Sequence, residues 1–167
     1  EAIGEVVVTS DSIGESGATW VASSTGLWLL KEKYFQDVPN LPKSAAKSIN
    51  FGNKNRVWIS FGDVYQVEEK SSQFTASPFD FDTQINTSLF HKNRLWLSTS
   101  DHEILVFQNK QLIRKYDLSI RGEGMFSLYA DLHNIIWFFQ APSDQPILGL
   151  AKINTNRQIK FYGEDKG

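Results

Sequence analysis

Four tryptophans recur along the chain at a nearly constant spacing, and this spacing limits the possible folds more than any other feature. Each lies in a short apolar run, and the separations are 38, 38 and 41 residues: Trp20, Trp58, Trp96 and Trp137. A period in this range is typical of proteins built from repeated structural units. We therefore interpret the chain as four copies of one unit.

The residues around each tryptophan repeat as well. Three positions before it stand residue types that enter the left-handed backbone conformation at low cost: Gly17, Asn55, Asn93 and Asn134. A further apolar run follows each tryptophan after a short interval, for example at residues 26–30 and 103–107. Each copy is therefore predicted to read strand, tight turn, tryptophan strand, turn, strand, turn, strand.

Units of four antiparallel strands and about 40 residues are typical of β-propeller blades. We predict an all-β chain, a β-propeller segment of four four-stranded antiparallel blades. The expected blades span approximately residues 1–39, 40–77, 78–120 and 121–167. The central strands of a blade are covered on both faces, so we expect the four tryptophans to be structural core residues.

The composition of the chain argues against several classes of function. A net charge of -2, from 17 basic and 19 acidic residues, gives no general attraction to nucleic acid. The absence of cysteine excludes disulfides, thiolate metal sites and cysteine nucleophiles. No apolar stretch approaches the roughly 20 residues of a membrane-spanning helix. We expect no nucleic-acid partner and no direct membrane contact by this segment.

The repeats are similar to those of a known family. The first copy reads Ala-Thr-Trp-Val-Ala-Ser-Ser-Thr-Gly-Leu-Trp over residues 18–28, and the others keep Asn-x-[Val/Leu/Ile]-Trp. This resembles the two-component regulator propeller repeat, Asp-x-x-Gly-x-[Ile/Leu]-Trp-[Ile/Val]-Gly-Thr-x-x-Gly-Leu-Tyr, over essentially the whole chain. The glycine after the tryptophan is replaced in every copy, by Ala22, Ser60, Ser98 and Phe139.

Proteins of that family are large sensors of the bacterial envelope, with propellers outside the inner membrane and an output module inside. The resemblance implies a periplasmic or extracellular location and a non-enzymatic, ligand-sensing role in a two-component-type regulator, with carbohydrate as the ligand class. A histidine kinase output would belong to the parent protein and not to this chain. Sensors of that family usually have more than four blades. Either these four blades close tightly, or the chain is part of a larger propeller that is completed by the remaining blades or, as we hypothesise, by a second copy in a homodimer.

A propeller gathers the loops of its blades at the ends of a channel, where a ligand touches several of them at once. We therefore expect ligand contacts from residues near the ends of the first strands and from two aromatic platforms. These candidates are Asn50, Asn86, His91 and Asp131, with Trp28 and Tyr65. A role in a turn or in the core is the alternative for each.

Enzymatic chemistry has weaker support. Asp80 and Asp82 would share one face of an extended segment, as an acid–base pair requires, and a second cluster spans residues 101–103. Solvated carboxylates are ordinary in loops, so we predict no catalytic residue, no metal and no cofactor. Two alternatives stay open: a sialidase- or lyase-like propeller enzyme, and an envelope protein-interaction scaffold.

Overall fold

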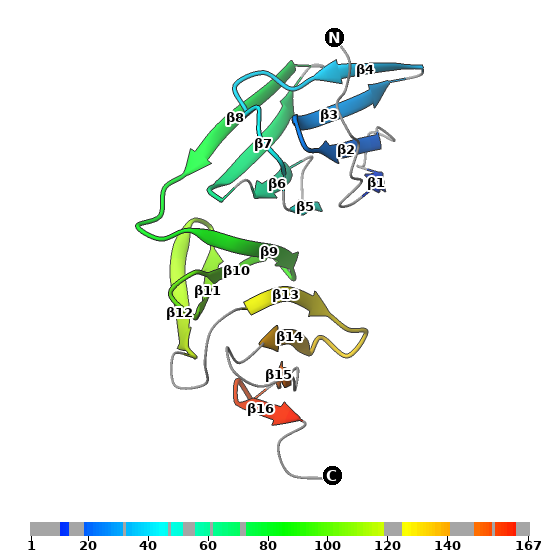
Figure 1. The fold of residues 1–167 in the computed structure, drawn as a ribbon. Coiled ribbons are helices and arrows are strands. Elements are labelled where there is room, and N and C mark those ends of the chain that lie inside the picture. The colour runs from blue at the N-terminus through cyan, green and yellow to red at the C-terminus, as the bar shows by residue number, and fades with distance from the viewer. Residues whose placement is uncertain are drawn as a thin grey trace. The chain divides into compact units, whose positions relative to one another are not determined.

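The computed structural model describes most of the chain. The described residues are 11–13, 19–31, 33–46, 48–51, 56–60, 62–70, 73–118, 125–140, 149–154 and 156–162. All regular structure in these residues is β, arranged as four four-stranded antiparallel sheets (Figure 1). The predicted class and sheet type are therefore confirmed. Two residues of the repeat pattern, Gly17 and Asn55, lie outside the described residues.

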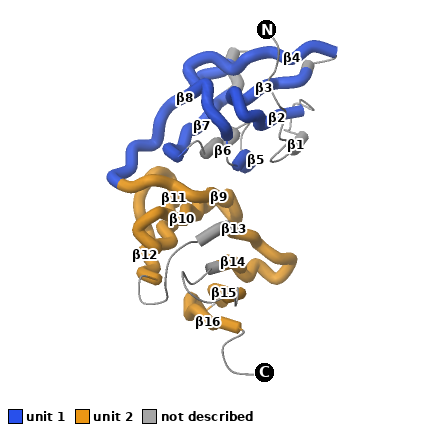
Figure 2. Tube along the Cα trace, viewed as in Figure 1, with its two compact units in different colours: residues 1–82 blue, residues 83–167 orange. Residues whose placement is uncertain are grey.

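The first half of the chain, residues 1–82, forms one compact unit with two sheets (Figure 2). Sheet 1 consists of β1 (Asp11–Ile13), β2 (Thr19–Ser23), β3 (Gly26–Lys31) and β4 (Tyr34–Asp37). Sheet 2 consists of β5 (Ser48–Phe51), β6 (Arg56–Ser60), β7 (Val64–Lys70) and β8 (Gln73–Phe79). The approximate boundary expected at residue 77 falls inside β8, which continues to Phe79.

Residues 83–167 form the second unit, again with two sheets. Sheet 3 consists of β9 (Ile85–His91), β10 (Arg94–Thr99), β11 (Glu103–Gln108) and β12 (Gln111–Asp117). Sheet 4 consists of β13 (Met125–Ala130), β14 (Ile136–Gln140), β15 (Gly149–Ile153) and β16 (Ile159–Tyr162). In every sheet each strand pairs with the next one along the chain, and the tryptophan lies on the second strand.

Left-handed residues close the hairpins of the second unit. Lys92 and Asn93, between β9 and β10, have φ of 48° and 59°. Asn109 and Lys110, between β11 and β12, have φ of 50° and 66°. Two consecutive positive φ angles are the mark of a type I′ turn, whose twist matches that of the paired strands. Asn134, before β14, also has a positive φ, of 63°.

Each unit has a core between its two sheets. In the first unit, Trp20 packs edge-to-face on Phe74 of the neighbouring sheet, with ring centroids 5.4 Å apart. In the second unit, Trp96 of sheet 3 belongs to one apolar cluster with Ile136 and Phe138 of sheet 4. Burying such large faces supplies most of the driving force for stacking one sheet on the next.

The tryptophans do not share one environment. Trp20 and Trp96 are 2% and 7% exposed, as expected of core residues. Trp137 is half-buried and is flanked on its strand by Ile136 and Phe138, which belong to the core cluster. Because neighbouring residues of a strand point to opposite faces, Trp137 lies on the face of sheet 4 that is turned away from this core. The side chain of Trp58 is not among those described.

A pair of leucines tests the core of the second unit. Leu118 is 3% exposed inside the apolar cluster, whereas Leu132 is 98% exposed. We expect Leu118→Ala to lower the free energy of unfolding by about 2–5 kcal/mol, because it removes buried methyl groups and leaves a cavity. We expect Leu132→Ala to change it by less than about 0.5 kcal/mol. Equal effects of the two substitutions in urea unfolding would contradict the position of this core.

Candidate functional site

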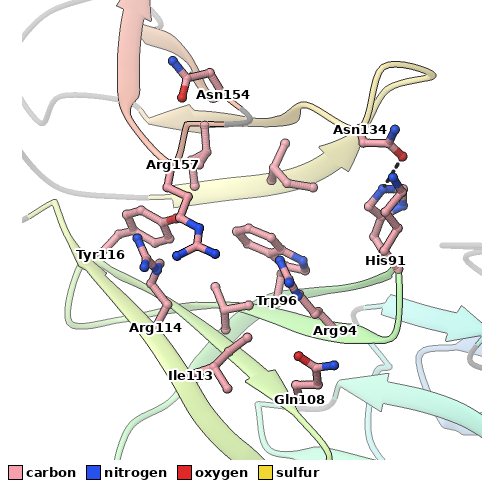
Figure 3. Close-up of a pocket in the computed structure, with 14 residues that line it drawn as sticks. His91, Arg94, Trp96, Gln108, Ile113, Arg114, Tyr116, Asn134, Asn154 and Arg157 are labelled. Carbon is pink, nitrogen blue, oxygen red and sulfur yellow. Dashed lines mark hydrogen bonds between the residues drawn. The ribbon is translucent and has the colours of Figure 1, made fainter.

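A pocket of about 560 Å³ lies between sheets 3 and 4, entirely within the second unit (Figure 3). Its lining residues come from both sheets, and several of them lie in the turns that connect neighbouring strands or at the adjoining strand ends. Lys92 belongs to the β9–β10 turn, Asn134 precedes β14, and Arg157 belongs to the turn between β15 and β16. A ligand in this pocket would touch two sheets at once.

The floor of the pocket is formed by residues of the apolar core between sheets 3 and 4. Trp96, Val106, Ile136 and Ile153 both line the pocket and belong to the apolar cluster between the sheets. Tyr116 lies beside Trp96, with the two rings stacked at a centroid distance of 6.5 Å. The pocket therefore offers aromatic surface next to its polar rim.

Basic side chains dominate the polar part of the lining. They come from β9, β10, β12 and two turns: His91, Lys92, Arg94, Arg114 and Arg157. Three amides, Gln108, Asn134 and Asn154, and the hydroxyl-bearing Tyr116 are also in the lining. No aspartate or glutamate is among the described residues that line the pocket. The site is therefore rich in hydrogen-bond donors and positive charge.

Two residues join the sheets at the rim of the pocket. The His91 ring Nε2 lies 3.1 Å from Asn134 Oδ1, and Figure 3 shows this contact at the edge of the site. When Nε2 carries the proton, the imidazole donates this hydrogen bond. His91 is therefore held against the neighbouring sheet.

The indole N–H of Trp96 is a buried hydrogen-bond donor without a partner in the described chain. Its side chain is 7% exposed, and no acceptor among the described residues lies within hydrogen-bond distance of its Nε1. A buried indole N–H ordinarily has a partner, because an unpaired buried donor costs free energy. The Trp96 Nε1 donor is therefore buried and unpaired within the described part of the chain.

Of the six residues expected to contact a ligand, His91 lies in the pocket lining. Asn86 donates from Nδ2 to the Thr99 carbonyl at 3.1 Å, a contact within sheet 3. Trp28 donates from Nε1 to Ser23 Oγ at 3.0 Å. Asn50 lies opposite Trp58 in sheet 2, and Tyr65 lies opposite Pro78 in the same sheet. Trp28, Asn50 and Tyr65 belong to the first unit, so the pocket does not include them.

Asp131 organises the turn between β13 and β14. Its Oδ1 accepts hydrogen bonds from the backbone N–H groups of His133 and Ile135 at 2.8 and 2.9 Å. Its Oδ2 accepts one from Trp137 Nε1 at 2.8 Å. The Trp137 hydrogen bond, followed by that of Ile135, lowers the pKa of Asp131. The carboxylate holds the turn and the indole in place.

The acidic clusters considered for catalysis lie outside the pocket lining. Asp80, Asp82 and Asp101 are exposed. Glu103 forms an ion pair with Lys115, and this hydrogen-bonded contact raises the pKa of the lysine. The described part of the chain contains no group of three histidine, aspartate or glutamate side chains placed to hold a metal ion.

Sequence reasoning did not single out the three arginines. Arg94 is two residues before Trp96, and Arg114 is two residues before Tyr116, so each pair lies on one face of its strand. This spacing of a cation and an aromatic residue was the available signal. Which strand faces meet at the pocket depends on how the sheets pack.

Comparisons with known proteins place the chain by its fold. No protein-family model matches the sequence, and no curated protein matches it. Among the described residues, no helix is long and apolar enough to cross a membrane.

Several solved structures are similar to the chain. The extracellular domain of a putative hybrid two-component system from B. thetaiotaomicron matches with a TM-score of 0.74 and 15% identity, over 95% of this chain and 21% of that one. A catalytically inactive virginiamycin B lyase from Staphylococcus aureus, crystallised with quinupristin, matches with a TM-score of 0.67 and 15% identity, over 92% and 54%. The WD40 β-propeller domain of Doa1 matches with a TM-score of 0.65 and 11% identity, over 95% and 54%.

These likenesses concern the fold, which is that of β-propeller blades. The chain spans about a fifth of the two-component extracellular domain and about half of the lyase and of the WD40 domain.

The stability that Asp131 contributes to its turn depends on pH. Its lowered pKa means that the carboxylate contributes stability in full above its ordinary pKa of 3.8. This contribution declines as pH falls below that value and is lost once pH passes below the lowered pKa. Asp131→Asn should therefore lower the melting temperature at pH 7, and the difference from wild type should shrink as pH approaches 3.

Asp82→Asn serves as the control, since Asp82 is exposed and lies outside this turn. It should leave the melting temperature at pH 7 nearly unchanged. A pH-independent difference between wild type and Asp131→Asn would show that the ionised carboxylate is not what holds the turn.

Proposed function

We propose that this chain is a non-enzymatic, ligand-binding β-propeller segment from the sensor region of a bacterial two-component-type regulator, and that its ligand is a carbohydrate. The pocket between sheets 3 and 4 carries this proposal. Its volume of about 560 Å³ lies within the range of roughly 300–1,000 Å³ that is usual for small-molecule sites. Both sheets contribute residues, so ligand binding would be coupled to the way in which they pack.

The pocket lining combines aromatic and polar side chains, and a sugar can contact both. A sugar ring has apolar C–H faces that pack on aromatic side chains and hydroxyl groups that need hydrogen-bond partners. Tyr116 and Trp96 supply aromatic surface for the first, and Gln108 supplies an amide for the second. A few placed polar groups beside apolar surface are usual in ligand sites.

Two independent observations support the sensor role. The repeat pattern resembles that of regulator propellers, and one of the similar folds is an extracellular domain of a putative hybrid two-component system. A periplasmic or extracellular location is part of the same proposal. The parent protein would carry the output module.

A propeller lyase is the second candidate, because a lyase is among the similar folds. Acid–base catalysis of lyase or glycosidase type needs positioned proton donors and acceptors. Among the described lining residues, His91 is the one histidine, and no carboxylate joins it. This composition favours binding over turnover.

The free face of sheet 4 fits a second copy of the chain. Tyr129 and Trp137 are paired across β13 and β14, and Tyr129 is 65% exposed. Lys152 and Tyr162 contact the Trp137 ring on the same face. We propose that this face packs against another four-stranded sheet in a homodimer, as Trp96 packs against sheet 4.

Light scattering after size exclusion tests this dimer. We expect a mass twice the 19.0 kDa of one chain. Tyr129→Lys should give a monomer, because it adds a third positive charge beside Lys152 and Lys160. A monomeric wild type at all concentrations would contradict the dimer.

A thermal-shift screen of oligosaccharides tests the ligand site. A ligand at 100 times its Kd should stabilise the fold by about 2.7 kcal/mol. Gln108→Ala should weaken this stabilisation. Gln111→Ala should keep it, since Gln111 pairs with Gln108 across the hairpin but is exposed and does not line the pocket. Release of reducing ends or unsaturated products from a stabilising glycan would favour the enzyme instead.

A further inference from the structure

The charge of the pocket limits the kind of carbohydrate that it accepts. We infer that the site selects an acidic carbohydrate, one that carries carboxylate or sulfate groups. This inference rests on the proposed function and narrows its ligand class. It starts from the three guanidinium groups of Arg94, Arg114 and Arg157.

The positive charge is local and is not a property of the whole protein. The chain has a net charge of -2, yet the described pocket lining holds three arginines and a lysine without an acidic residue. Among the described residues, ion pairs join Lys43 to Asp37 and Lys115 to Glu103, and neither pair involves the pocket. The pocket cations therefore have no carboxylate partner within the described chain.

Charge balance sets the ligand preference. The hydroxyl groups of a neutral ligand can accept hydrogen bonds from these guanidinium groups, but they do not balance the positive charge that loses its water. An anionic ligand balances that charge and forms paired hydrogen bonds in which both partners are ionised, which are shorter and stronger. The site therefore discriminates against uncharged sugars as well as attracting charged ones.

The two sheets present their guanidinium groups to the same space. Figure 3 shows Arg157, from the β15–β16 turn, and Arg114, from β12, pointing toward each other across the pocket. Arg114 lies over the Tyr116 ring, with Cζ 5.8 Å from the centroid, which restricts the plane of its fork. Planar forks of this kind match the oxygens of carboxylate and sulfate groups.

The hydrogen-bond inventory agrees with an anion. Trp96 Nε1 is a buried donor without an acceptor in the described chain. Two of the lining amides already use their oxygen, since Asn134 Oδ1 contacts His91 and Asn154 Oδ1 accepts from the Gln158 backbone N–H. Donors therefore outnumber free acceptors in this pocket. A ligand rich in acceptor oxygens fits that excess.

Titration calorimetry on the full chain, with two matched pairs of probes, tests the inference. The first pair is trigalacturonate and its methyl ester, which differ in carboxylate charge. The second is a 6-sulfated galactose oligosaccharide and its unsulfated form. We expect at least one charged probe to bind on the order of tenfold or more tighter than its neutral partner, and to weaken as salt is raised. The pair that responds identifies the anionic group.

Arg114→Gln and Arg157→Gln should each reduce the affinity for the charged probe on the order of tenfold. Lys115→Gln is the matched control, because it removes the same charge from the residue next to Arg114 but lies outside the pocket lining. All three sites are exposed or partly exposed, so each variant should remain folded, and a cooperative thermal transition will verify this.

The possible failures are distinguishable. Neutral probes that bind as tightly as charged ones would overturn the acidic ligand and leave the carbohydrate site standing. Charged probes that lose as much affinity in Lys115→Gln as in Arg114→Gln would overturn the pocket as the origin of the selectivity. A chain that binds no carbohydrate, charged or neutral, would overturn the proposed function together with this inference.

Discussion

The structure depends on the face-to-face packing of one four-stranded sheet on the next within each unit. The second strand of each sheet is flanked by strands on both sides, and the side chains on one of its two faces pack against the neighbouring sheet. Trp20 and Trp96 fill this position and are almost completely buried. A large flat ring buries much apolar surface between two sheets, as Trp20 and Trp96 do, whereas Trp137 lies on the opposite face of its sheet.

The candidate site is a product of the same packing. Where the core of the second unit reaches the hairpin turns, Trp96, Ile136 and Ile153 form the floor of the pocket. The turns and strand ends add polar and cationic groups around that floor, among them Arg94 and Arg157. The fold thus supplies a rigid apolar base, while the chemistry comes from residues that the sheet itself does not require.

The sequence predicted the repeat well because its signals are local. A tryptophan in an apolar run, with Asn93 or Asn134 three residues earlier, marks a tight turn and a central strand, and both asparagines are left-handed. The site was harder to predict. His91 was anticipated from its place at a strand end, but Arg114 and Arg157 are 43 residues apart and meet only because two sheets pack together. Asp131 also resembled a ligand residue, although its carboxylate holds a turn.

The indole N–H signals of the protein provide the most direct test of ligand binding in this pocket. Trp96 Nε1 has no acceptor in the described chain, whereas the N–H groups of Trp28 and Trp137 are bound to Ser23 and Asp131. In an NMR titration with the carbohydrate selected by calorimetry, the Trp96 indole signal should shift and saturate while the other two stay in place. Saturable shifts of Trp28 or Trp137 with an unmoved Trp96 would contradict the account, because the ligand would then bind elsewhere.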